Sequence, residues 1–388
     1  MLSLQNNFVK GVGIIPYRIH SKPSHLLAYD AACSALEDSD LGMGDVDAVI
    51  VSNLEWFYSS EKQRHMASVL SSAFKTRIPI IRVPAACAGG GTAFWAANRM
   101  MKNDKEWNNV LVIGVEKLME TSDNSAAIIN EFMMAMESRW EQPEGINAPC
   151  SAALTAQEYM QRFPDTTMDD LALISFKNHS NGFNNPNAFF YKKKVTLEQI
   201  KKSPIASSPL RVHDCSISCD GAAACVITKD KTDIEIVGSD YCADNIIPFE
   251  RDDPLTWEAT LISSGNALKQ AGITIKDIDI AELHDAFTIV ELLSYEDLGF
   301  CKKGEAYKLV RDGFFGIDGK VPANVSGGLK AKGHPVSATG LGMIYELAKQ
   351  LRNEAGDRQV SNLKYALMHN IGGIGNAIVC NILKKVGG

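Results

Sequence analysis

The chain has 388 residues, of which 45% are hydrophobic and 22% charged, and its formal net charge is −7. The acidic balance argues against a protein that binds nucleic acid, since such proteins normally present a basic face. No apolar run approaches the length of about 18 residues that a membrane span needs, and the N-terminus lacks a signal-peptide pattern. The nine cysteines lack the spacing of a zinc site, so we expect no metal, reduced thiols and a cytoplasmic location.

A strand, a helix and a second strand follow one another near the start, and the same order recurs in the second half. The first copy is expected over residues 9–15, 24–37 and 45–53, and the second over 234–238, 259–271 and 277–285. Both copies carry Asp-x-Asp at the start of their last strand. The repetition predicts an internally duplicated protein.

Each copy continues into a further helix and strand. The first passes through Cys87 and its helix to a strand over residues 110–115, and the second through Asn324, a helix over 337–351 and a strand over 365–368. Strands that alternate with helices form parallel sheets covered on both faces. We therefore predict a layered α/β fold built from two βαβ-rich halves.

The stretch from residue 116 to residue 210 interrupts this rhythm. We interpret it as an inserted loop domain over a site, because long insertions in compact folds are usually functional. The expected division is a first part of the N-terminal half (1–115), the insertion (116–210), the last strands of that half (211–232) and the C-terminal half (233–388). The lysine run of the insertion, 192–194, is either a solvated face or a contact for the phosphates of a nucleotide-bearing ligand.

Cys87 lies where an apolar run ends at Pro84 and a glycine-rich turn leads into a helix. A thiol at a helix start lies near unpaired backbone N–H groups and the positive end of the helix dipole. We therefore expect a lowered pKa and a reactive thiolate. The alternative is a small buried residue in a turn.

Polar residues recur at the ends of the other predicted strands. They are His284 and Asp285, the loop 324–335 that contains His334, and the stretch 369–375. Ligands gather at the carboxyl ends of strands in α/β sheets, so these spots are expected to meet Cys87. A cysteine with a histidine is the minimum for acyl transfer through a thioester, and glycine loops supply backbone N–H groups for an oxyanion hole.

These motifs together resemble those of the thiolase family, nearly from end to end. They are Ala-Ala-Cys-Ala-Gly-Gly-Gly around Cys87, Ser-Cys-Asp-Gly from Ser218, His-Asp-Ala-Phe from His284, Asn-Val-Ser-Gly-Gly with Gly-His-Pro, and His-Asn-Ile-Gly-Gly from His369. Within the family the chain is similar to archaeal acetoacetyl-CoA thiolases and to the sterol-carrier-protein type. The resemblance implies an α-β-α-β-α fold whose inserted loop domain binds coenzyme A.

The resemblance also implies a role for each matching residue. Cys87 would take up the acyl group, His334 would activate it and help bind the thioester oxygen, and His284 would replace an asparagine that orients a water. The N–H groups of Cys87 and Gly372 would form a second oxyanion hole. Contacts to coenzyme A would come from Ser218, Gly328 and Lys330, with coenzyme A thioesters as substrates and no further cofactor.

The second cysteine of the family is missing. Bacterial members carry an acid/base cysteine where this chain has Asn370, and sterol-carrier-type members often carry one where it has Ala286. Claisen condensation needs a base that removes a proton α to a thioester. The remaining candidates are His284, which we favour, and His369.

The implied activity is that of an acetyl-CoA C-acetyltransferase, which joins two acetyl-CoA molecules into acetoacetyl-CoA and feeds mevalonate synthesis. The resemblance further implies a homodimer or dimer of dimers, and a complex with HMG-CoA synthase and a small zinc-ribbon OB-fold protein. The alternatives are a degradative 3-ketoacyl-CoA thiolase, a Cys–His hydrolase and a non-catalytic thiolase-like subunit. The sequence names no acyl chain length.

Overall fold

The computed structural model describes residues 6–54, 65–119 and 132–387. Its main sheet, within this described part, has nine strands in the order β3-β2-β4-β7-β1-β8-β11-β10-β9. The strands are β1 (Phe8–Arg18), β2 (Ala48–Ser52), β3 (Ile80–Arg82), β4 (Asn109–Glu116), β7 (Asp220–Thr228), β8 (Ile234–Ala243), β9 (Ile280–Leu283), β10 (Tyr365–Gly372) and β11 (Ala377–Lys385). Most are continuous apolar runs, as expected for strands covered on both faces.

The strand pairings repeat in the two halves. In the first half β3, β2 and β4 are parallel, and β7 is antiparallel to both β4 and β1. In the second half β9 and β10 are parallel, and β11 is antiparallel to β10 and β8. A short antiparallel pairing of β1 with β8 joins the halves. The predicted duplicated α/β fold is therefore confirmed.

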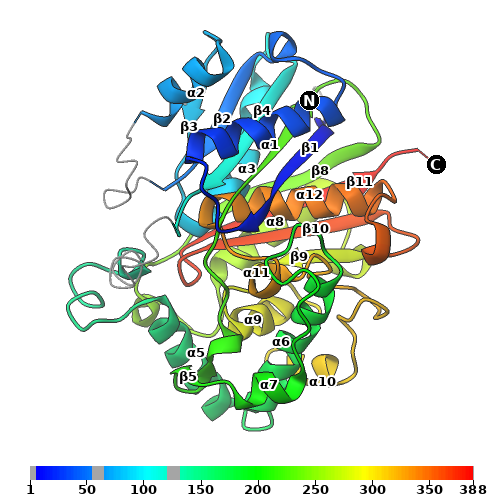
Figure 1. The fold of residues 1–388 in the computed structure, drawn as a ribbon. Helices are drawn as coiled ribbons and strands as arrows, with labels where there is room; N and C mark the ends of the chain where they lie inside the picture. The colour runs from blue at the N-terminus through cyan, green and yellow to red at the C-terminus, as the bar shows by residue number, and fades with distance from the viewer. Residues whose placement is uncertain (1–5, 55–64, 120–131, 388) are drawn as a thin grey trace.

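The helices form three layers around the strands (Figure 1). Helix α1 (Ser24–Asp38) packs its alanine-rich side on β1, β7 and β4, with α2 (Met66–Phe74) beside it, and α8 (Glu258–Ala271) packs on β8 and β11. Helices α3 (Gly89–Asn103) and α12 (Thr339–Leu351) lie together in the middle layer. They share one buried apolar cluster that includes Phe94, Leu341 and Ile344.

Glycines allow the first turns of α3 and α12 to touch. A Cβ atom on Gly340 would lie 2.3 Å from the backbone nitrogen of Gly91, and one on Gly90 would lie 2.6 Å from the carbonyl oxygen of Ser337. Any side chain there would force the helices apart, which only glycine avoids. This crossing brings together the helix starts that follow Cys87 and His334.

The Asp-x-Asp repeat has a structural explanation. The Asp47 carboxylate accepts hydrogen bonds from the backbone N–H groups of Asn108 and Asn109, at 2.6 and 2.8 Å. The Asp279 carboxylate accepts the corresponding pair from Lys364 and Tyr365, both at 2.8 Å. Each aspartate thus fixes the start of a neighbouring strand, and β2 and β9 begin after it, later than the sequence predicted.

Helices α5 (Ala148–Arg162), α6 (Met168–Phe183) and α7 (Leu197–Lys202) lie together below the layers in Figure 1, with the short pair β5 (Ile205–Ser207) and β6 (Leu210–Arg211). They belong to the predicted insertion, and α9 (Thr288–Asp297) and α10 (Ala306–Arg311) pack against α6. The domain boundaries themselves stay predictions. Among the described helices, none has the length and apolar character to cross a membrane.

Candidate active site

Cys87 occupies the middle of a 3₁₀ turn, Ala86–Ala88, between β3 and α3. Ala86 has φ 45°, a strained left-handed conformation of a kind often found at functional sites. The thiol is half-buried, and burial raises its pKa to about 11, although the Gly373 N–H group acts in the opposite direction. The expected lowering of the Cys87 pKa was therefore wrong, because loss of hydration outweighs the helix start.

Two histidines meet this cysteine. One ligand atom each of Cys87, His284 and His334 lie within 4.8 Å of one another, and the imidazole centroids are 5.3 Å apart at 80°. His284 directly follows β9, and its backbone N–H donates to the His369 carbonyl. The backbone N–H of His334 donates to the Ile217 carbonyl. The structure thus brings together the nucleophile and the two histidines that the sequence singled out.

Asn370 fixes the tautomer of the neutral His284 ring. The Gly91 N–H donates to Oδ1 of Asn370, so that atom is the acceptor and Nδ2 is the donor of the amide. Nδ2 donates to the Cys87 carbonyl and lies 3.1 Å from Nδ1 of His284. Nδ1 of His284 is therefore an acceptor, and the neutral ring carries its proton on Nε2. That nitrogen is buried and has no hydrogen-bond partner among the described residues.

Both imidazoles are held neutral. Burial, together with the neighbouring His334, keeps the pKa of His284 well below its ordinary value. Burial lowers the pKa of His334 to about 3, and the Lys330 ammonium adds to the effect. Nδ1 of His334 lies 2.7 Å from the Thr339 hydroxyl, which leaves Nε2 for the cluster. The site therefore contains a neutral thiol beside neutral imidazoles.

Asp285 connects the His284 strand end to the loop that carries His334. Its carboxylate accepts the backbone N–H groups of Leu329 and Lys330, in the short helix α11 (Gly328–Ala331), and the side-chain amide of Asn178. One dipeptide thus supplies a catalytic candidate, His284, and the carboxylate that holds the neighbouring loop, Asp285.

His369 lies on the other face of the sheet from Asn370. The two are neighbours in β10, whose side chains alternate between faces. Nε2 of His369 lies 3.1 Å from the Thr260 hydroxyl of α8, and burial lowers its pKa to about 3. The structure therefore does not bring His369 to the Cys87 cluster.

Three further predicted site residues, Gly328, Lys330 and Gly372, do not line the cavity beside the Cys87 thiol. Lys330 is 1% exposed, and its ammonium donates to the backbone carbonyls of Asp214 and Asp285. Gly328, at φ 58°, packs on the Asp285 carboxylate, where a Cβ would lie 2.5 Å from its oxygens. Gly372 ends β10, and the N–H group that faces the thiol is that of Gly373. These positions indicate structural roles for Lys330 and Gly328 rather than contacts with a ligand.

A cavity of about 90 Å³ opens beside the thiol. Its lining comprises Cys87, Phe132, Ala135, Ala148, Pro149, Cys215, Ser216, Ser218, His284, Ala286, Phe287, His334 and Gly373. Ser218 was predicted to contact the ligand and lies in this lining. Sequence reasoning missed Ser216, which lies just before the motif from Ser218. It included Phe287 in His-Asp-Ala-Phe but gave it no role, and Phe132 comes from the insertion.

The three ligand atoms of Cys87, His284 and His334 form a set that Zn²⁺ accepts in other proteins. Ligation through Nε2 of His284 would require its proton to move to Nδ1. Asn370 already donates to Nδ1 and opposes that tautomer. The arrangement therefore suits proton transfer better than metal binding, and the sequence expectation of no metal stays a prediction.

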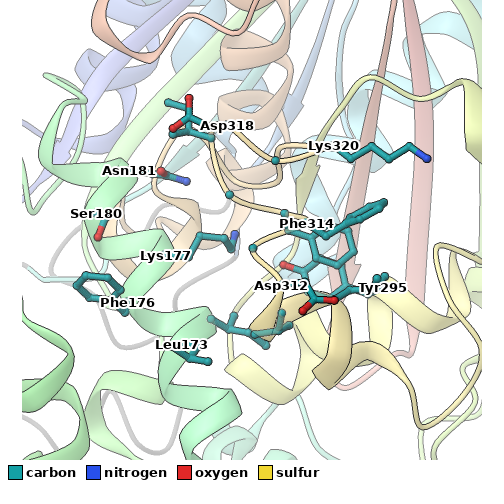
Figure 2. Close-up of a pocket in the computed structure, with 18 residues that line it drawn as sticks. Leu173, Phe176, Lys177, Ser180, Asn181, Tyr295, Asp312, Phe314, Asp318 and Lys320 are labelled. Atoms are coloured by element: carbon teal, nitrogen blue, oxygen red, sulfur yellow. The ribbon is translucent and has the colours of Figure 1, made fainter.

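A larger cavity, of about 670 Å³, lies between α6 and the segment 309–320 (Figure 2). Phe176 and Lys177 of α6 and Phe314 and Lys320 of the facing segment contribute to its walls. The Lys177 ammonium is already bound to the Glu291 carboxylate at 2.9 Å and to a backbone carbonyl. The two cavities share no lining residue, so this one is separate from the cysteine site.

Comparison with known proteins identifies the same family over both halves. The thiolase N-terminal domain matches residues 17–231, and the thiolase C-terminal domain-like family matches residues 244–385. The acetyl-CoA acetyltransferase of Methanothermobacter thermautotrophicus is 38% identical over 92% of this chain and 93% of that protein. Bos taurus sterol carrier protein 2 is 31% identical over 97% of this chain and 72% of that protein. Human mitochondrial 3-ketoacyl-CoA thiolase shares the fold, with a TM-score of 0.75 at 19% identity over 99% of this chain and 100% of that chain.

Proposed function

The chain belongs to the thiolase family and is an acyltransferase, and we propose that it is an acetyl-CoA C-acetyltransferase. It joins two acetyl-CoA molecules into acetoacetyl-CoA and free coenzyme A through an acetyl group held on Cys87. Archaeal relatives at 36–38% identity carry the name of that activity.

The observation that carries this proposal is the meeting of Cys87 with two neutral histidines at a small cavity. A thiol of pKa about 11 needs a neighbouring base before it attacks a thioester, and an imidazole is within reach. Cys87 belongs to the first half and both histidines to the second, so the site requires the duplicated fold.

The size of the cavity favours a short acyl group. At about 90 Å³ it is smaller than the apolar cavity of about 150 Å³ that holds a benzene molecule in an engineered protein. A degradative 3-ketoacyl-CoA thiolase would need room for a longer chain beside Cys87. The biosynthetic direction, a link to mevalonate synthesis and a cytoplasmic location are part of the proposal.

The assembly is proposed as a homodimer or a dimer of dimers. A complex with HMG-CoA synthase and a small zinc-ribbon OB-fold protein stays an expectation drawn from family resemblance. No surface described above selects either partner.

The test is cleavage of acetoacetyl-CoA, followed by its absorbance with and without free coenzyme A. A thiolase consumes acetoacetyl-CoA only when coenzyme A is present as acceptor. Consumption without coenzyme A would indicate a Cys–His hydrolase, and no consumption under either condition would indicate a non-catalytic subunit. Substrates of increasing chain length, tested in the same assay, would identify a degradative enzyme by a preference for long chains.

A further inference from the structure

The missing second cysteine leaves the carbon acid without an obvious base, and the hydrogen bonds of Asn370 bear on which group replaces it. Asn370 offers two amide hydrogens, of which one goes to the Cys87 carbonyl and the other to Nδ1 of His284. Oδ1 of Asn370 accepts a hydrogen bond from the Gly91 N–H group at 3.2 Å. If the amide were rotated by 180°, its NH₂ group would face this N–H donor and the hydrogen bond would be lost. His284 is consequently a donor toward the cavity, through Nε2.

From this geometry, and resting on the proposed function, we propose that the two histidines have opposite roles. His284 donates its Nε2–H to the thioester oxygen of the substrate. His334, with its proton on Nδ1 toward the Thr339 hydroxyl, is the base for both proton transfers. Asn370 is a positioning residue, which acts by setting the tautomer of His284. The sequence had favoured His284 as the base.

Elimination among the three clustered atoms supports the assignment. Sγ of Cys87 carries a proton in the resting protein, and Nε2 of His284 carries another. With the Thr339 hydroxyl accepting from Nδ1 of His334, as proposed, Nε2 of His334 is the one atom of the three with a free lone pair. After acylation the sulfur has no proton left, so the same lone pair becomes available to the second substrate.

The proton transfers balance under this assignment. His334 takes the thiol proton as Sγ of Cys87 attacks the first acetyl-CoA, the C–S bond to coenzyme A breaks, and the proton passes to the departing sulfur. His334 then takes an α-proton from the second acetyl-CoA, whose enolate oxygen is bound by His284. The α-carbon attacks the acetyl group, a C–C bond forms, the bond to Sγ breaks, and His334 returns the proton to Cys87.

Substitution by glutamine separates a donor from a base at position 284. A glutamine amide can present N–H near the place of Nε2 but cannot accept an α-proton. His284→Ala should lower the kcat of acetoacetyl-CoA thiolysis by about 10²–10³-fold, the usual effect of removing one oxyanion donor. His284→Gln should recover at least about tenfold of that loss, while Cys87 is acetylated in both variants. Equal loss in His284→Gln and His284→Ala would overturn the donor role.

His334→Gln tests the base directly. The rates of Cys87 acetylation and of thiolysis should both fall by about 10²–10⁴-fold, since one base serves both steps. Acetylation of Cys87 in His334→Gln at the wild-type rate would overturn the assignment. A wild-type protein that neither acetylates nor cleaves acetoacetyl-CoA would instead refute the proposed function, so the two failures are distinguishable.

The role of Asn370 has a readout that a merely structural residue would not change. In protein labelled with ¹⁵N-histidine, the His284 signal, identified by its absence from His284→Gln, should show the proton on Nε2. Asn370→Asp, of nearly the same shape, accepts from Nδ1 and should move the proton there while thiolysis falls. A proton on Nδ1 in the wild-type protein, or an unchanged tautomer in Asn370→Asp, would overturn the proposal.

Discussion

Cys87 is a neutral thiol in the resting protein, because burial raises its pKa to about 11. The fraction of thiolate should then rise about tenfold per pH unit up to that value, whereas a thiol of ordinary pKa, about 8.5, levels off earlier. Alkylation of Cys87 by iodoacetamide, without substrate, should still be accelerating at about pH 10. Peptide mass analysis resolves Cys87 from the other cysteines, and a rate that levels off near pH 9 would contradict the raised pKa of Cys87.

His369 is the residue whose predicted role the geometry supports least, since its ring bonds Thr260 on the far face of the sheet. We expect His369→Gln to keep thiolysis within about tenfold of the wild-type rate, well short of the loss that follows removal of a positioned base. Its free energy of unfolding should fall by about 1–3 kcal/mol, as for a buried polar group that loses a partner. A loss of activity as large as that of His334→Gln would place His369 in the chemistry.

At the scale of elements, the crossing of α3 and α12 holds the two helix starts of the site together. A Cβ on Gly340 would lie 2.3 Å from Gly91 N and 2.4 Å from Oδ1 of Asn370. Gly340→Ala should therefore destabilise the protein by about 1–3 kcal/mol, the usual cost of overpacking, and lower activity by displacing Asn370.

Gly265→Ala is the matched control, because Gly265 lies on the exposed side of α8 and its Cβ would meet nothing within 4 Å. This substitution should raise stability by about 0.5–1 kcal/mol, since alanine favours a helix interior. Thermal unfolding of both variants is the measurement. Equal midpoints would show that the crossing is not tightly packed.

The order of elements was predictable from the sequence because the periodicity of apolar residues reports directly on strands and helices. The helix at 24–37 and the duplicated series were found this way, and α1 ends one residue later than expected. The starts of β2 and β9 could not be predicted this way, because the carboxylates of Asp47 and Asp279 bind chain segments 61 or more residues away. Such long-range bonds leave no local periodic signal.

The site was predictable as a set of residue types and less so as a set of roles. Cys87, His284 and His334 were found from glycine-flanked motifs at strand ends. The sign of the Cys87 pKa shift depends on burial, which the turn sequence does not reveal. The bond between Asn370 and His284 joins residues 86 positions apart, and it determines which nitrogen carries the proton.

At the scale of the whole molecule, the site lies where the two halves meet, and one sheet edge bears on assembly. Among the described strands β3 is the last of the sheet on its side, and an edge strand presents backbone groups that a second copy can pair with. We expect light scattering to give a mass of about 85 kDa, twice the 42.3 kDa of the chain, at micromolar concentration. A mass near that of the single chain would contradict the proposed homodimer.

The most direct test of the central claim is the mass of the peptide that contains Cys87 after incubation with acetyl-CoA. The proposed function predicts one added acetyl group on that peptide, its absence in Cys87→Ala, and its removal when free coenzyme A is added. An acetyl group on Cys150, Cys219 or another residue instead, or none at all in a folded protein, would contradict an acyl-enzyme mechanism through Cys87.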